Sequence, residues 1–452
     1  NGPDYSVSDS VRPLIFSLED EFGKVNLTYT ENFSLYNPVY IVLDYGDTAD
    51  DGTLEVGHTL PSGELDATNN GLGQIVGSAG GKDITGDGFT DLVILINNNN
   101  DTLDLYLIPG GTRSEGSLGD GNSYLIARWD NTLEYIPTDM ELGDINGDGF
   151  SDIIFGFGNE HFENNDHDYN GSRLDTDGMV EIIHGSTLSS LLTDITWTSF
   201  LSPLDGRLAN FGTEIAVIDM NNDGYDDIVV GAPYADKSDI QDLDDGAVYI
   251  IFGKAELKIN SYNSDAESYE STDYGTSINY FSEFSGSEES EFGEAIAVGD
   301  FNGDGIGDYA VSMSEYGTPS GNGIVFIYLG DRFGPPQMKV VINGIKENAQ
   351  LGDGQGSLHG LGDVNGDGYD DLGMKDTEGN FFIAWGQQSW TQDYDYNGDG
   401  EVDTRLLDLS DLSSLDGIYL SSASIDSFFT FKGVGDVNND GFDDFVINTP
   451  YE

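Results

Sequence analysis

A nine-residue motif recurs along this chain, and each copy leads into a short apolar run. In the copy from Asp219 to Asp227, oxygen-bearing side chains stand at positions 1, 3, 5 and 9, while Tyr225 at position 7 offers only its backbone carbonyl. Gly224 allows a tight turn that directs these oxygens toward one point. A shell of six to eight oxygens suits Ca²⁺. The motif therefore predicts a calcium-binding loop.

Seven copies of the motif are present. A single copy could be an ordinary acidic turn, because Asp, Asn and Gly favour turns, but seven copies indicate a repeated unit. We therefore predict up to seven bound Ca²⁺ ions. The predicted ligands, at positions 1, 3, 5, 7 and 9 of each copy, are Asp83, Thr85, Asp87, Phe89, Asp91; Asp144, Asn146, Asp148, Phe150, Asp152; Asp219, Asn221, Asp223, Tyr225, Asp227; Asp300, Asn302, Asp304, Ile306, Asp308; Asp363, Asn365, Asp367, Tyr369, Asp371; Asp395, Asn397, Asp399, Glu401, Asp403; and Asp436, Asn438, Asp440, Phe442, Asp444.

The residues after position 9 separate these loops from an EF-hand. An EF-hand needs a bidentate Glu at position 12, and every copy carries an apolar residue there. The copy at Asp395 follows its predecessor after only 32 residues, so we interpret it as an extra loop inserted late in the repeat of Asp363. Its position 7 is Glu401, which either adds a ligand or faces solvent.

The spacing of the copies predicts the architecture. Without the inserted copy, consecutive loops begin 61 to 81 residues apart, and each is followed by a strand-like run such as Ile228–Val230. A repeat of this length has room for four short strands and is too long for one coil of a solenoid. We predict an all-β fold, a β-propeller of seven four-stranded blades with the calcium loops between strands 1 and 2. A six-bladed ring is the alternative, if the N-terminal strands all join the last blade.

The whole chain is expected to form one domain. One N-terminal segment reads as a repeat whose first turn lost its metal, because Asp50–Val56 parallels Asp244–Phe252. The chain stops just after the second strand of the last repeat, so an N-terminal strand is expected to close that blade. The expected segments are 12–18 for the closing strand, 24–70 for the metal-free blade and 71–452 for the calcium-loop blades, within a single domain 1–452.

Charge and composition restrict the partners and the location. The formal charge is −67, from 83 acidic and 16 basic side chains, and seven bound Ca²⁺ ions would still leave −53. This charge excludes nucleic acid as a partner and favours a saline environment that screens self-repulsion. The absence of cysteine excludes a disulfide scaffold, and no run approaches the length of a membrane span. Weak calcium loops and a first residue other than Met favour an extracellular protein, secreted or at the cell surface.

One connection carries candidate ligand-binding side chains. Residues 159–178 form the longest insertion between second and third strands, on the face opposite the calcium loops, and contain His161, His167, Tyr169 and Arg173. One interpretation is a polar surface loop. The other is a lyase site, with His161 or His167 as base, Tyr169 as acid and Arg173 neutralising a uronate carboxylate.

The residues around the best-formed loop resemble a known family. Phe211–Gly212, the calcium loop and Gly231–Pro233 together resemble the FG-GAP repeat of the integrin α-subunit propeller, and Phe292–Gly293 and Asn448–Pro450 are partial copies of its two ends. The resemblance implies a seven-bladed propeller with calcium between strands 1 and 2 of a blade. It also implies that some blades lack the metal.

The sequence favours a non-enzymatic function. We expect a calcium-stabilised extracellular binding or structural module that acts in adhesion or cell-surface assembly, with a protein or glycan partner. No residue is assigned as catalytic. The alternative is a polysaccharide lyase that acts on acidic polysaccharide.

Overall fold

The computed structural model describes much of the chain from residue 14 to residue 448. The described residues are 14–18, 27–28, 41–43, 54–56, 74–98, 102–111, 123–130, 136–158, 178–193, 195–201, 209–235, 246–255, 276–280, 290–315, 321–388, 390, 404–409, 417–420, 430–438 and 440–448.

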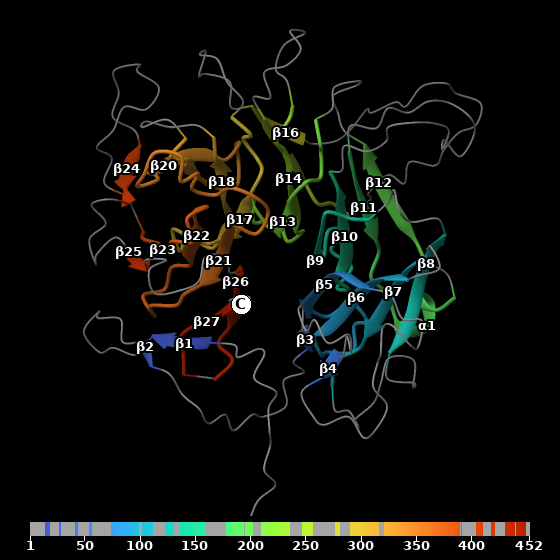
Figure 1. The fold of residues 1–452 in the computed structure, drawn as a ribbon. Helices are drawn as coiled ribbons and strands as arrows, with labels where there is room; N and C mark the ends of the chain where they lie inside the picture. The colour runs from blue at the N-terminus through green and yellow to red at the C-terminus, as the bar shows by residue number, and fades with distance from the viewer. Residues whose placement is uncertain are drawn as a thin grey trace, which may run out of the picture.

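These residues form strands and one short helix (Figure 1). The elements are β1 (Leu14–Leu18), β2 (Leu27–Thr28), β3 (Ile41–Leu43), β4 (Leu54–Val56), β5 (Gln74–Lys82), β6 (Asp91–Asn98), β7 (Thr102–Ile108), β8 (Tyr124–Asp130), β9 (Asp139–Gly143), β10 (Asp152–Phe157), β11 (Met179–Ile183), α1 (Leu188–Leu191), β12 (Trp197–Leu201), β13 (Ile215–Ile218), β14 (Asp227–Ala232), β15 (Ala247–Ile251), β16 (Thr276–Tyr280), β17 (Ile296–Gly299), β18 (Asp308–Met313), β19 (Ile324–Leu329), β20 (Gln337–Asn343), β21 (Leu358–Gly362), β22 (Asp371–Lys375), β23 (Phe381–Ala384), β24 (Arg405–Asp408), β25 (Gly417–Leu420), β26 (Thr430–Gly435) and β27 (Asp444–Asn448).

Within each large sheet, strands that follow one another in the sequence pair antiparallel. The sheet β13-β14-β15-β16 shows the pattern, with Val229 of β14 opposite Ala216 on one side and Ile250 on the other. Every residue of β14 and β15 is buried. Their near-continuous apolar sequences fit a middle strand that neighbouring sheets cover on both faces.

The core lies between consecutive sheets. Ile154 and Val180, from the sheet of β9 to β12, pack in one cluster with Ile228 and Val230 of the next sheet. The first strands β5, β9, β13, β17, β21 and β26 lie side by side in that order. Figure 1 shows the sheets standing around a common centre. The fold is therefore a β-propeller, and the number of blades stays a prediction.

The N-terminal strands divide between two sheets. β1 runs antiparallel to β27 and also pairs with β2, so the last sheet has the order β2-β1-β27-β26. β2 lies inside segment 24–70, which the sequence assigned to the metal-free blade. In that segment the described part otherwise contains β3 and β4, which pair with each other alone. The assignment of 24–70 as a blade stays a prediction.

The sequence did not predict where the segment after the Asp395 loop would go. β24 pairs parallel with β20, with Val340 opposite Arg405, and so adds a fifth strand to the outer edge of the preceding sheet. β25 then returns to pair with β23 in its own sheet. Between β23 and β25 the chain therefore contributes β24 to the neighbouring sheet, and β24 joins the two blades.

Candidate metal centres

Six copies of the motif occupy equivalent places in the propeller. Each lies between the first and second strands of its sheet, at the same end of the blades. The six loops are 83–91 between β5 and β6, 144–152 between β9 and β10, 219–227 between β13 and β14, 300–308 between β17 and β18, 363–371 between β21 and β22, and 436–444 between β26 and β27.

The carboxylate at position 1 is held by the turn that follows it. In the first loop the Asp83 carboxylate accepts hydrogen bonds from the backbone N–H groups of Gly86 at 2.7 Å, Asp87 at 3.2 Å and Gly88 at 2.8 Å. Gly86 and Gly88 have φ of 69° and 89°, which residues with a side chain rarely adopt. The glycines of the motif thus permit the turn, and the turn fixes the direction of the first carboxylate.

The carboxylate at position 9 is buried and ties the loop to the third strand. Asp91 Oδ2 accepts from the N–H groups of Ile84 and Thr85, at 2.8 and 2.9 Å, and Asp91 Oδ1 accepts from the N–H of Gly110 at 2.7 Å. A glycine just beyond the third strand serves the same role in four other sheets. The equivalent pairs are Asp152 with Gly185, Asp227 with Gly253, Asp308 with Gly330 and Asp371 with Gly386. We did not predict this partner, although a glycine recurs there in the sequence.

The donor atoms of these loops fit a hard cation. Carboxylate oxygens of Asp83, Asp87 and Asp91 lie within 4.8 Å of one another. Two buried side-chain oxygens of these loops, Thr85 Oγ1 at position 3 and Asp308 Oδ2 at position 9, have no hydrogen-bond partner among the described residues. An unpaired buried oxygen costs free energy, and a coordinated ion would supply its partner. All the predicted side-chain ligands in these loops are oxygens.

Burial places these carboxyl groups in an unfavourable electrostatic setting. Burial, with a smaller contribution from the nearby carboxylates at positions 5 and 1 of the same loop, raises the pKa of Asp227 to about 7, of Asp308 to about 8 and of Asp371 to about 9. Desolvation and like charge both disfavour the ionised form. The ionised form of these carboxyl groups is therefore disfavoured unless a nearby positive charge compensates it.

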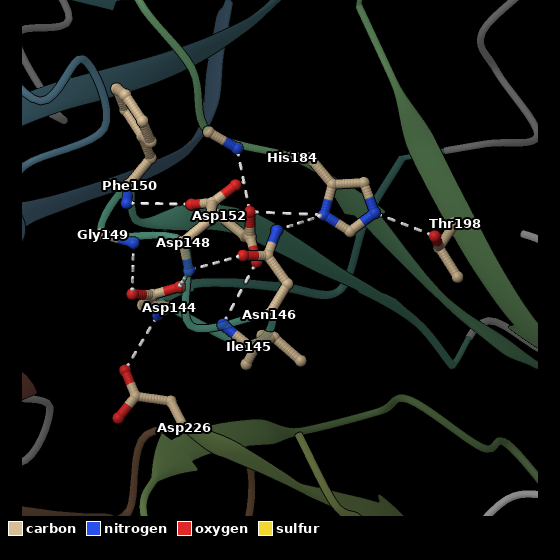
Figure 2. A network of polar contacts seen from close by, with 11 residues as sticks. Asp144, Ile145, Asn146, Asp148, Gly149, Phe150, Asp152, His184, Thr198 and Asp226 are labelled. Carbon is tan, nitrogen blue, oxygen red and sulfur yellow. Dashed lines mark hydrogen bonds and ion pairs between the residues drawn. The ribbon is translucent and has the colours of Figure 1, made fainter. Parts of the chain in front are cut away.

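The loop 144–152 has a neighbour that the sequence did not reveal (Figure 2). His184 Nδ1 lies 3.3 Å from Asp152 Oδ1, and its Nε2 lies 2.9 Å from Thr198 Oγ1. An Asp–His–Thr series resembles a nucleophile relay, but Thr198 is only 1% exposed and a substrate could not reach it. Phe252 stands at the matching place in the next sheet. His184 therefore supports the loop rather than forming a reactive centre.

The FG and GAP residues lie at the opposite end of the blades and pack neighbouring sheets together. Phe211 is buried and forms an isolated bridge with Gly178 of the preceding sheet. A Cβ atom on Gly231 would stand 2.0 Å from the carbonyl oxygen of Gly293 in the next sheet. Glycine is required there because the backbones of two blades meet.

Two groups of predicted site residues lie outside the described residues, and their roles stay predictions. The first is the inserted loop, with Asp395, Asn397, Asp399, Glu401 and Asp403. The second is the candidate ligand loop, with His161, His167, Tyr169 and Arg173.

Part of this chain is similar in sequence to known proteins. The FG-GAP repeat family matches residues 211–251. Integrin alpha-PS2 of Drosophila melanogaster is 30% identical over 219 residues, which are 46% of this chain and 14% of that protein. Integrin alpha-7 of Mus musculus is 32% identical over 44% of this chain and 14% of its own length. Integrin alpha-V of Gallus gallus is 28% identical over 53% of this chain and 20% of its own length.

The matches cover only a small share of these much longer relatives. Within the part of the chain that the structure describes, no helix has the length and apolar character needed to cross a membrane. The family match, the integrin relatives and the four-stranded sheets agree with one another. The chain carries an FG-GAP, integrin α-like propeller domain.

Proposed function

We propose that this chain is an extracellular, calcium-stabilised propeller module that acts in adhesion or cell-surface assembly. The observation that carries the proposal is the equivalent place of six acidic loops at one end of the blades, together with the carboxylate oxygens of Asp83, Asp87 and Asp91, which lie within 4.8 Å of one another in the first loop. The similarity to integrin α subunits supports the adhesive role.

Positions 1, 3, 5 and 9 of each loop would hold the ion through side chains, and position 7 through its carbonyl. A bound Ca²⁺ would supply two positive charges to a site where carboxylates are crowded and partly buried. The described residues around it orient these ligands, as the N–H groups of Gly86 and Gly110 do for Asp83 and Asp91. Metal binding would then stabilise the folded ring, because an unfolded chain presents no such shell.

The charge of the chain limits what the module can bind. With −67 formal charges, or −53 after seven ions, a partner has to be basic, uncharged like a neutral glycan, or joined through further calcium. The connections between second and third strands, above all the predicted ligand loop 159–178, would suit recognition, because loops on a rigid scaffold commonly carry binding residues. A protein or glycan on a cell surface fits both requirements.

Adhesion with and without calcium tests this proposal. Immobilised chain would be offered to cells and to a glycan array in calcium, in magnesium alone, and after chelation. We expect calcium-dependent binding that a variant lacking 162–173 loses while it keeps its fold and calcium content. Equal binding in all three buffers, or no binding to any surface by a calcium-loaded chain, would contradict the proposal. Cleavage of an acidic polysaccharide that His161→Ala or His167→Ala abolishes would instead favour the lyase.

A further inference from the structure

Consecutive loops are joined by one repeated backbone hydrogen bond. The N–H of position 8 in each loop donates to the carbonyl oxygen of position 1 in the preceding loop. The five bonds are Ser151 to Asp83 at 2.8 Å, Asp226 to Asp144 at 3.0 Å, Gly307 to Asp219 at 2.8 Å, Asp370 to Asp300 at 3.1 Å and Asp443 to Asp363 at 3.0 Å. Each proposed site is thus linked to the next through the residue that carries its first ligand.

At three of these junctions the side chain of position 8 adds a second bond. Asp226 Oδ2 accepts from the backbone N–H of Asp144 at 2.9 Å (Figure 2). Asp370 and Asp443 make the same contact with the position 1 residue of the loop before them, at 2.8 and 2.9 Å. This carboxylate thus contacts the preceding loop, whereas the predicted oxygen shell of its own loop is formed by positions 1, 3, 5, 7 and 9.

The preceding blade has made room for this carboxylate. The residue before position 1 is glycine at the same three junctions, and a Cβ atom on Gly143 would lie 2.3 Å from Val217 Cγ1 and 3.0 Å from Asp226 Oδ2. A Cβ on Gly362 would lie 2.1 Å from Asp443 Oδ2. Where position 8 is Gly307, the corresponding residue is Ile218, whose side chain fills the space instead. The glycine and the aspartate therefore occur together.

The contact between Asp226 and Asp144 can orient a predicted metal ligand, the Asp144 carboxylate. The backbone N–H and C=O of Asp144 are both held by Asp226, and the Asp144 carboxylate is the first predicted ligand of its own loop. Fixing both backbone groups of one residue limits the directions its side chain can take. Groups that orient a metal ligand in this way commonly change metal affinity by about 10–100-fold when they are removed.

We propose that Asp226, Asp370 and Asp443 are positioning residues for the cation site of the preceding loop rather than ligands of their own. The inference rests on the calcium binding proposed above. It implies that neighbouring cation sites are also coupled through this aspartate, and because such coupling is reciprocal, calcium in either loop favours calcium in the other. Calcium in loop 219–227 and calcium in loop 144–152 then favour each other.

Hydrogen exchange of individual loops, followed as calcium is added to the full chain, tests this coupling. Asp226→Ala is expected to raise the calcium concentration at which loop 144–152 becomes protected by roughly tenfold, and to leave the midpoint of loop 219–227 within about twofold. Asp226→Asn keeps an acceptor oxygen and should restore most of the midpoint. Loop 363–371, far from the change, reports whether the fold is intact.

Two further variants serve as matched controls. Ser151→Ala alters position 8 at a junction without a carboxylate and should leave loop 83–91 unchanged. Lys82→Ala removes the cation that lies 3.3 Å from Asp226 Oδ2 and separates that ion pair from the bond to Asp144. The inference is wrong if Asp226→Ala changes the calcium midpoint only in loop 219–227, equally in every loop, or in no loop. Calcium binding itself would still stand. A wild-type chain whose loops do not respond to calcium overturns the proposed function as well.

Discussion

Two neighbouring junctions of the loop ring join their blades by different means. Between loops 144–152 and 219–227, a Cβ atom on Gly147 would lie 2.5 Å from the ring of Tyr225, so the ring rests on bare backbone, and Asp226 adds its carboxylate. Between loops 219–227 and 300–308 there is no aromatic residue and no carboxylate at these positions. Asn222 replaces the glycine there, and its Nδ2 donates to the Gly305 carbonyl oxygen at 2.6 Å.

Both junctions keep the backbone hydrogen bond from position 8 to position 1 of the preceding loop, and they differ in side chains that change in pairs. A ring at position 7 requires a glycine at position 4 of the preceding loop, as Tyr369 on Gly303 and Phe442 on Gly366 also show. Where position 4 carries a side chain, position 7 is the smaller Ile306. A change at one partner alone should therefore be harmful, and a change at both should be tolerated.

Removing calcium should weaken both kinds of junction and have the largest effect. At a calcium concentration ten times the dissociation constant, each site contributes about 1.4 kcal/mol, so six sites contribute about 8 kcal/mol. That approaches the whole stability of a typical domain. We expect chelation in low salt to lower the melting temperature by more than about ten degrees. A melting curve that does not change after verified removal of metal would contradict a structural role for the ion.

Disrupting the junction between loops 144–152 and 219–227, where the Tyr225 ring packs on Gly147, should have the next largest effect. Gly147→Ala places a Cβ atom against the Tyr225 ring at a φ of 68°, and we expect a loss of about 2–4 kcal/mol from overpacking and backbone strain together. Gly149→Ala is the matched control, because its φ is 86° and no atom lies within 4 Å of the added Cβ. It should cost only about 1 kcal/mol. Equal losses in chemical denaturation would show that the ring contact contributes nothing.

Giving the junction between loops 219–227 and 300–308 the residues of the neighbouring junction should have a smaller effect. It should also show whether positions 222 and 306 interact. Asn222→Gly alone removes the bond to Gly305, and Ile306→Tyr alone brings a ring against the Asn222 side chain. We expect each single variant to lose about 1–2 kcal/mol, and the double variant to recover about 0.5–1.5 kcal/mol of the sum. Additive losses in a double-mutant cycle would mean that the two positions do not interact.

The exposed ion pair at the first junction should have the smallest effect. Lys82 is about half exposed, and its Nζ lies 3.3 Å from Asp226 Oδ2. A surface pair of this kind contributes about 0–1 kcal/mol. Lys82→Ala should change the unfolding free energy by less than about 0.5 kcal/mol, and less again at high salt. A loss larger than that of Gly149→Ala would show that Lys82 has a role beyond the pair.

Much of this architecture could be predicted from the sequence because the motif carries its own geometry. The spacing of Asp, Asn and Gly defines the loop, and the apolar run after it defines the second strand. Contacts between repeats were harder to predict, because residues such as Asp226 and Asp144 are 82 positions apart and only the arrangement of blades brings them together. The path of β24 to the preceding sheet was missed for the same reason.

His184 illustrates a different limit of the sequence. In the sequence it is an isolated histidine, and only the pairing of β11 with β10 on one side and β12 on the other places it between Asp152 and Thr198. The glycine that binds the position 9 carboxylate left a visible signal, because it recurs after the third strand of five sheets. That signal has a meaning only when the third strand is known to lie beside the loop.

Counting the calcium ions bound to the chain tests the central claim most directly. Equilibrium dialysis against calcium, with magnesium in excess, should give six or more ions per folded chain, at least one for each described loop. Asp223→Ala, which removes a predicted ligand from loop 219–227, should lower that number by about one, or by about two if the coupling to loop 144–152 is strong. A wild-type chain that binds no calcium, or a number unchanged by Asp223→Ala, would contradict the account.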